Sequence, residues 1–500
     1  MSRIKIGWSM KEISIDDNLL LFGQMYMRIS QGILDPTFAT ALVLDSGEGH
    51  VIFCCCDLEA FRGNCIQDTV KNVVALRPEI NPDSIIMNVT HSHTAGASVE
   101  TPEVSPDGVP IFSGLKYREH IVRRCTEAIV EAWDNRREGG IAYGYGYAVV
   151  AHSRRVIYSE DMSLVHKNPI SPNGHGIMYG NTQYPQFRHY EAGADHFLNL
   201  MFTFDKDEKI TGVVVNVPCP SQLSEHFLMQ SSDYWCEVRR MVKEQFGEDV
   251  MVLPQCAAAG DLSPRILHYK EAQARRMKLK YDLQYDPNIA AGKMDKEQIK
   301  VRSERLDIAE RILQGIQEVY AWAKKDILWE PEICCTRKVV PLTRRFVTEA
   351  EKVWCEETLE QLRRSIPDPE TVSPEEYRHA VSYYESIRDR NSKALARYEQ
   401  QQTQATLDYP IYVAKVGDIA FASNPFELYQ DYMHRIQARS PFIQTFVIQL
   451  CGAPDASYVC TERANASKGY SASLFCNLVS PEGGQELVEA TLDLLGQLAQ

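Results

Sequence analysis

Short hydrophobic runs alternate with longer stretches of mixed polarity over about the first 260 residues. The runs at 39–45 and 50–56, separated by a Ser-Gly-Glu-Gly turn, predict two adjacent strands. Helical periodicity follows at 64–76 and 115–133. Further strands are predicted at 84–89, 141–150, 198–204, 210–217 and 250–254. Because strands and helices alternate, we expect an α/β fold with a mixed β-sheet core covered by helices.

Two later segments, at about 266–325 and 348–402, are rich in Glu, Lys, Arg, Gln and Ala and poor in strand formers. Ser373-Pro374-Glu375-Glu376 in the second is typical of a helix start, because Ser caps the helix and Pro suits its first turn. Strand and helix patterns then resume, at 412–422, 445–450 and 485–498. We interpret both polar segments as helical excursions from a single domain over residues 1–500.

The composition narrows the classes of partner. The chain has 500 residues, 44% of them hydrophobic, and a net charge of −14. An acidic surface disfavours nucleic acid and anionic membranes, which both require a positive face. No apolar run approaches the ~20 residues of a membrane span, and residues 1–8 enter a strand pattern without a secretory signal. We expect a cytoplasmic protein with a small-molecule substrate and no membrane insertion, and the sequence is compatible with a homo-oligomer.

The cysteines of the chain are consistent with a cytoplasmic protein. The chain has 14 cysteines but no Cys-x-x-Cys pair, so neither a zinc ribbon nor a dithiol redox site is supported. Cys54, Cys55 and Cys56 continue a strand pattern, and Cys451 follows another. We expect these cysteines to be small buried hydrophobic residues.

Candidate chemistry begins at Thr90-His91-Ser92-His93, directly after the strand at 84–89. Two imidazoles two residues apart at the end of a strand point to the same side of the chain. Both can then reach one metal ion, or one can bind metal while the other contacts a substrate.

Three other segments carry polar side chains after predicted strands. Asp261 and Ser263 lie in Gly260-Asp261-Leu262-Ser263-Pro264, where open α/β folds place their sites, although Asp261 can also cap backbone amides. Glu427 is predicted to open a helix, where it either binds a divalent metal or favours the helix dipole. Tyr458 and Tyr470 bracket a polar loop, as a ligand and a donor or as packing residues.

Taken in order, these segments resemble the neutral/alkaline (non-lysosomal) ceramidase family. The segments at 28–36 and 39–44 and the carboxylate Asp57 also look like that family's opening. The match is spread over nearly the whole chain, and its specificity rests on the ordered combination. The resemblance implies the fold of the ceramidase catalytic domain, here without the family's C-terminal β-sandwich.

The resemblance also implies a zinc amidase, in which bound Zn²⁺ lowers the pKa of water to ~7 and polarises a carbonyl. His91, Glu427 and Tyr458 would belong to the metal shell, and His93 would stabilise the oxyanion or shuttle protons. The remaining catalytic positions would be the essential serine Ser263 with its neighbour Asp261, the site arginine Arg154 and the substrate-side phenol Tyr470.

The sequence departs from the family at the second zinc histidine. Pro220 occupies that position in the segment 216–222, and proline cannot bind metal. Glu225 or His226 lies close enough to substitute, and Cys219 is a third candidate. The serine motif ends in Arg265 instead of the family's Asn, which favours a different substrate with negative charge.

Three functions follow from these observations. The first is a zinc-dependent hydrolase of the ceramidase superfamily that cleaves an amide, or alternatively an ester, of a small polar compound. The second is a carbohydrate-active hydrolase that cleaves a glycosidic or lactone bond with the carboxylates Asp57, Glu59, Glu225, Asp261 and Glu427. The third is a non-catalytic binding protein on a degenerate ceramidase fold, with Pro220 marking the loss of zinc.

Overall fold

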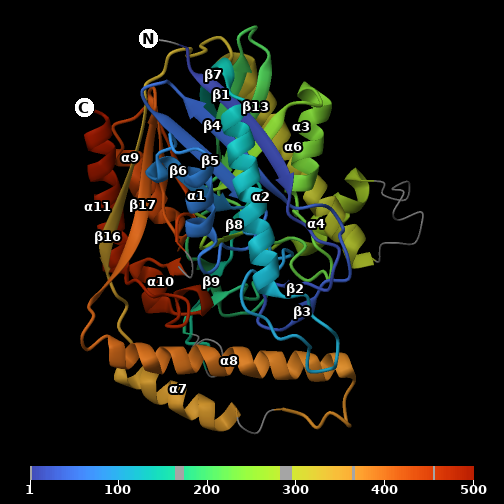
Figure 1. The fold of residues 1–500 in the computed structure, drawn as a ribbon. Helices are drawn as coiled ribbons and strands as arrows, with labels where there is room; N and C mark the ends of the chain where they lie inside the picture. The colour runs from blue at the N-terminus through green and yellow to red at the C-terminus, as the bar shows by residue number, and fades with distance from the viewer. Residues whose placement is uncertain (1–2, 164–173, 282–295, 363–365, 454–456) are drawn as a thin grey trace.

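Two β-sheets packed face to face form the centre of the protein (Figure 1). The computed structural model describes residues 3–163, 174–281, 296–362, 366–453 and 457–500. The larger sheet has eight strands in the order β14 (Met251–Cys256), β13 (Ile210–Val217), β12 (Phe197–Asp205), β7 (Arg137–Tyr147), β1 (Lys5–Glu12), β4 (Phe38–Asp45), β5 (His50–Cys56), β6 (Ile85–Val89). The smaller has four, in the order β16 (Ile333–Thr343), β17 (Thr406–Val416), β18 (Ile419–Ser423), β20 (Gln444–Ile448).

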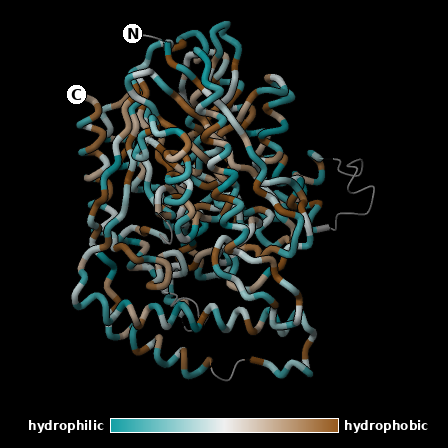
Figure 2. The backbone as a smooth tube through the Cα atoms, in the orientation of Figure 1, coloured by the Kyte–Doolittle hydropathy of each residue, from teal (hydrophilic) through white to brown (hydrophobic). Residues whose placement is uncertain are grey.

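The larger sheet is hydrophobic on both faces because its central strands are apolar at successive positions. In β4, Ala41 and Val43 pack toward the helices, whereas Leu42 and Leu44 pack against the smaller sheet. Such continuous runs are typical of strands buried on both sides. In Figure 2, hydrophobic segments recur through the crowded centre of the molecule, where these strands lie. The predicted α/β class with a mixed sheet is confirmed.

Helices cover the outer face of each sheet. The large sheet packs against α1 (Cys65–Leu76), α2 (Gly114–Asp134), α3 (Trp235–Phe246) and α6 (Lys296–Ala323). The small sheet packs against α9 (Gln430–Arg439) and α11 (Pro481–Leu498). The strand predicted at 412–422 is in fact two strands, β17 and β18, because Gly417 turns the chain at a φ of +60° that glycine adopts freely.

Both polar segments contain helices. In the first, α4 (Lys270–Lys280) precedes α6, and residues 282–295 lie outside the described residues. The second forms a pair of adjacent helices, α7 (Glu349–Leu362) and α8 (Pro374–Gln400), at the bottom of Figure 1. Ser373 and Glu376 make the reciprocal capping bonds at the start of α8, as its sequence predicts.

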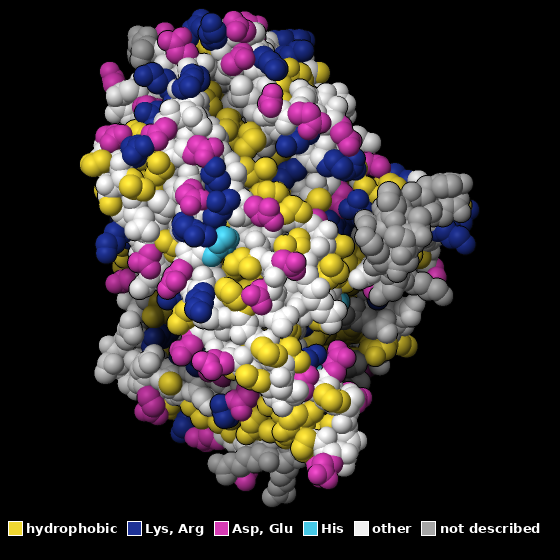
Figure 3. Space-filling view, turned by 45° about the vertical axis from the view of Figure 1, so that its right-hand side comes forward, with side chains coloured by type: hydrophobic (Ala, Val, Ile, Leu, Met, Phe, Trp, Pro, Cys, Tyr) yellow, Lys and Arg dark blue, Asp and Glu magenta, His cyan; other side chains and the backbone are white. Residues whose placement is uncertain are grey.

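Shorter elements build the loops around the sheet ends. They are β2 (Leu20–Leu21), β3 (Arg28–Ile29), β8 (His152–Ser153), β9 (Arg155–Tyr158), β10 (Gly176–Met178), β11 (Phe187–Tyr190), β15 (Leu262–Ser263), β19 (Glu427–Leu428), β21 (Tyr458–Val459) and α10 (Glu462–Ser467). Acidic and basic side chains are interspersed over the face in Figure 3. Within the described ranges, no helix combines the length and apolarity needed to cross a membrane.

Candidate functional site

A cavity of about 1450 Å³ lies at the ends of the strands and includes His91, His93, Arg154, Glu427 and Tyr458 in its lining. His91 and His93 follow β6 of the large sheet, whereas Glu427 and Tyr458 follow β18 and β20 of the small one. Each of these strands runs parallel to a neighbour, and such strand ends are where α/β proteins place their sites. The two sheets therefore contribute opposite halves of one cavity floor.

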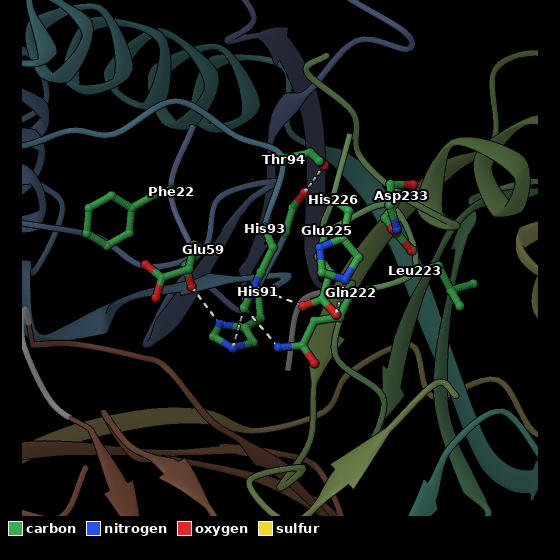
Figure 4. A network of polar contacts seen from close by, with 12 residues as sticks. Phe22, Glu59, His91, His93, Thr94, Gln222, Leu223, Glu225, His226 and Asp233 are labelled. Carbon is green, nitrogen blue, oxygen red and sulfur yellow. Dashed lines mark hydrogen bonds and ion pairs between the residues drawn. The ribbon is translucent and has the colours of Figure 1, made fainter. Parts of the chain in front are cut away.

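His91 has a constrained position at the centre of this floor. Its backbone φ of +61° is uncommon for a residue with a side chain, and such strain clusters at functional sites. Nδ1 lies 2.9 Å from the backbone oxygen of Glu59 (Figure 4). Because a carbonyl only accepts, Nδ1 donates, and Nε2 faces Glu427 Oε2 at 3.3 Å and His93 Nε2 at 3.2 Å.

His93 is held by an amide and a carboxylate (Figure 4). Arg154 donates to Gln222 Oε1 at 3.3 Å, so the amide nitrogen of Gln222 faces His93 Nε2 at 2.8 Å. His93 Nδ1 lies 3.4 Å from Glu225 Oε2, and Glu225 also pairs with Arg265. Burial lowers the pKa of His93, although Glu225 opposes this. His93 is therefore a neutral imidazole at neutral pH.

Arg154 joins the other half of the floor. Its guanidinium donates to the oxygen of Gly260 at 2.8 Å and to the Tyr458 hydroxyl at 3.1 Å, and it lies 3.8 Å from Glu427 Oε2. Burial favours the neutral carboxyl, but His91, Arg154 and Tyr458 lower the pKa of Glu427 to about 2. Burial also opposes charge on His91, but the Glu427 carboxylate raises the pKa of that imidazole.

The donor set fits a divalent metal. In the neutral tautomer fixed by Glu59, His91 Nε2 and Glu427 Oε2 face each other with lone pairs, so a proton or a cation must lie between them. Zinc with N and O ligands at ~2.0–2.1 Å implies ligand separations of ~3.3–3.4 Å, close to the 3.3 Å between these atoms. The Tyr458 hydroxyl, which hydrogen-bonds Glu427, would be the third donor, and three protein ligands are usual at a catalytic zinc.

The three candidates for the missing histidine have contacts other than the His91–Glu427 pair. Glu225 contacts His93 and Arg265, not His91. The His226 side chain is 63% exposed at the cavity rim. Cys219 is buried, and its thiol donates to the Val150 oxygen. The side chain that lies beside His91 and His93 is instead that of Gln222. The sequence indicates Gln222 only as a polar residue shortly after a predicted strand.

Asp261 and Ser263 are not part of the described cavity wall. The Asp261 carboxylate accepts from the backbone and side-chain nitrogens of Gln430, each at 3.1 Å, and its carbonyl accepts from Arg154 N. The Ser263 hydroxyl accepts from Arg265 N at 3.1 Å. Asp261 thus contacts Gln430 and the backbone of Arg154, close to Glu427.

The structure places two other carboxylates, Glu427 and Asp57, differently from what the sequence predicts. Glu427 does not open a helix: it lies in β19, which pairs with β21 at Tyr458, and α9 begins only at Gln430. This pairing turns the Glu427 carboxylate into the cavity. Asp57 is buried in a two-pronged ion pair with Arg239 and is absent from the wall.

One cysteine cluster lies apart from this floor. Among the described residues, Cys54, Cys56 and Cys125 form the one group of three His, Cys, Asp or Glu whose ligand atoms all lie within 4.8 Å of one another. All three are buried in the apolar layer between β5 and α2. Burial raises the pKa of the Cys56 thiol well above its ordinary value, which favours the protonated, apolar form.

Comparison with known proteins supports the architecture. No protein-family model and no curated protein matches the chain. Among solved structures, a neutral ceramidase from Pseudomonas aeruginosa superposes over 100% of this chain and 75% of its own, with a TM-score of 0.67 and 15% identity. A ceramidase complexed with C2 covers 100% and 76%, with a TM-score of 0.65 and 14% identity. The chain therefore has a neutral ceramidase-like fold.

Proposed function

We propose that the protein is a hydrolase that cleaves an acyl bond, an amide or alternatively an ester, in a small polar substrate. Zinc would be held by His91, Glu427 and Tyr458. The observation that carries the proposal is the His91–Glu427 pair, whose lone pairs converge at 3.3 Å with the tautomer fixed by Glu59. The ceramidase-like fold adds support at the level of reaction class.

Zinc bound there would polarise the substrate carbonyl and acidify a water molecule. The chain's own residues supply the rest of the chemistry. Arg154 stays charged next to Glu427 and Tyr458, so it can stabilise negative charge on the carbonyl oxygen. His93 is neutral and oriented by Gln222, so its Nε2 can accept a proton during attack and return it to the leaving group.

A carboxylate-only glycosidase mechanism has less support. It requires one carboxyl group that stays protonated near neutral pH to act as the acid. Burial raises the pKa of Asp57 and Asp261, but neither of them lines the cavity. For Glu59, Glu225 and Glu427, neighbouring arginine and histidine residues outweigh burial and lower all three pKa values. These carboxylates are therefore ionised, which suits them to hold cations.

The test combines metal content with activity. Protein exposed to zinc and then dialysed should retain one zinc per chain by elemental analysis and hydrolyse members of a panel of small N-acyl amides and esters. His91→Ala should lose both properties, whereas His226→Ala at the rim should keep both. Failure of the wild-type protein to bind zinc in excess metal, or unchanged turnover in His91→Ala, would overturn the proposal. Metal-free protein that still binds small polar compounds would favour a binding role.

A further inference from the structure

Helix α8 forms one wall of the same cavity. Its polar cavity-lining residues recur at helical spacing along one side, namely Ser382, Ser386, Asp389, Arg390, Lys393 and Arg397. The helix is tied to the body at that side, because the Ser382 hydroxyl accepts from Met27 N at 2.9 Å and Arg378 pairs with Asp107 at 2.6 Å. The wall is therefore a fixed part of the cavity that carries three basic side chains.

Arg390 differs from the other cavity arginines in its partners. Those on other elements face a carboxylate, in the pairs Arg62–Glu59, Arg154–Glu427, Arg265–Glu225 and Arg311–Asp307. Arg390 instead donates to the Tyr470 hydroxyl at 3.3 Å and the Cys476 thiol at 3.7 Å, both neutral groups. No carboxylate in the described part of the chain pairs with it. Arg390 is partly buried, and a cation in such a position is stabilised when a bound ligand supplies a counter-charge.

Arg397, two turns further along α8, also has no carboxylate partner among the described residues. Its guanidinium donates to backbone oxygens, including that of Asn477 at 3.0 Å and that of Arg345 at 3.3 Å. Burial lowers the pKa of Arg397 to about 10, so it is still charged at neutral pH. Lys393 between them pairs with Asp389 at 2.7 Å. Two guanidinium groups on this wall therefore lack a carboxylate partner among the described residues.

A short chain of contacts links Arg390 to the floor. The Arg390 guanidinium lies over the Tyr470 ring, 5.6 Å from its centroid. The Tyr470 ring contacts the Tyr458 ring edge to face, with centroids 6.3 Å apart. Tyr458 in turn contacts Arg154, next to Glu427. A group bound at Arg390 would thus lie one tyrosine pair away from the residues that face the bond to be cleaved.

We propose that Arg390, supported by Arg397, binds an anionic group of the substrate, a carboxylate or a phosphate, while His91 and Glu427 face the scissile bond. The inference rests on the proposed function and extends it to the substrate class. A planar guanidinium matches the paired oxygens of such anions. The neutral Tyr470 and Cys476 leave its charge to the ligand, and Tyr470 orients its plane.

The experiment titrates the full-length protein with inorganic phosphate and, separately, with succinate in a calorimeter. Arg390→Gln should weaken binding of the preferred anion by at least ~10-fold, as expected for the loss of a hydrogen bond to a charged group. Arg390→Lys keeps the positive charge but lacks the paired N–H donors of a guanidinium, so it should give an intermediate loss of anion affinity. Arg388→Gln is the matched control, because Arg388 lies on α8, pairs with Glu385 and is 54% exposed. The preferred probe identifies the anion as a phosphate or a carboxylate.

Equal affinity in Arg390→Gln and wild type, or no binding of either anion by the wild type, would overturn the inference. Thermal melting of Arg390→Lys and Arg390→Gln checks that α8 is still docked. Glu427→Gln separates this proposal from the proposed function, because it should abolish hydrolysis and keep the anion affinity. Arg390-dependent binding in a protein without hydrolytic activity would contradict the hydrolase and support the anion site.

Discussion

The floor of the cavity and its α8 wall balance charge in different ways. On the floor, Glu225 and Glu427 each lie beside an arginine and a histidine, and Arg154 has neutral acceptors as well. On the wall, Arg390 and Arg397 donate to a phenol, a thiol and backbone oxygens. The carboxylates of the floor thus have cationic partners within the chain, whereas Arg390 and Arg397 of the wall have no carboxylate partner among the described residues.

This difference separates two tasks. Residues fixed in mutual ion pairs cannot reorganise easily, which suits groups that stabilise a developing charge. A cation left with neutral partners suits recognition of a substrate group. The floor comes from the strand ends of the two sheets, while the wall comes from a helical segment between β16 and β17. The two proposals thus assign chemistry and selectivity to different elements, as expected where one fold accommodates many substrates.

The largest effect should come from the floor. Glu427→Gln removes a proposed metal ligand and the partner of His91, so kcat/KM should fall by ~10³-fold, comparable to the loss of a group that stabilises a transition state. Steady-state kinetics on the best substrate of the panel measures this. Glu297→Gln is the control, because Glu297 lines the cavity but its side chain is 64% exposed. A control as impaired as Glu427→Gln would erase the distinction between floor and rim.

The metal affinity of the floor can be raised. In Gln222→His, an imidazole replaces the amide that now faces His93, and zinc affinity should rise by at least ~10-fold because nitrogen donors suit zinc. Competition against a chromophoric chelator measures the affinity. Gln24→His places the same substitution elsewhere on the cavity lining and should change nothing. An equal gain in both variants would show that the cavity binds zinc without a defined floor.

A smaller effect is expected at the support beneath the floor. Asp261→Ala removes the acceptor for both nitrogens of Gln430, which should cost ~1–3 kcal/mol of unfolding free energy, as for an unsatisfied buried donor. Urea denaturation measures the loss. Zinc stoichiometry should stay at the wild-type value. Full stability combined with lost turnover would instead give Asp261 a direct part in the reaction.

The smallest effect concerns a neutral group on the cavity lining, His152. Burial, followed by the nearby His196, lowers the pKa of His152 to about 4. An unfolded histidine has a pKa of about 6.5, so the unfolded chain takes up this proton first. His152 therefore favours the folded state above pH 6.5, and that contribution is lost as the pH falls toward 4. His152→Gln should flatten the decline in melting temperature over this range, whereas His189→Gln on the surface should not.

The sequence predicted more of the floor than of the wall. The α/β class is confirmed, and the structure brings His91, His93, Arg154, Glu427, Tyr458 and Tyr470 to one cavity. Their roles stay predictions. Short motifs at strand ends were informative because a strand end fixes where the next side chains point. Gln222 was missed because nothing local distinguishes it from any polar loop residue.

The contribution of α8 could not be predicted for a different physical reason. Its sequence has an ordinary amphipathic pattern with a clear helix start, and that pattern fixes a helix but not what the helix packs against. The contacts of Arg390 with Tyr470 and Cys476 join residues 80 and 86 positions apart. Such pairings depend on the docking of the whole α7–α8 pair.

Because His91 follows a strand of one sheet and Glu427 follows a strand of the other, any compound that contacts both residues would link the two sheets. Binding to the native state alone raises stability by mass action, by ~2.7 kcal/mol at a hundredfold excess over Kd. Melting curves recorded against a library of small acids would thus sort ligands from non-ligands without an assay for turnover. A rise in melting temperature would then identify the compounds that bind between the two sheets.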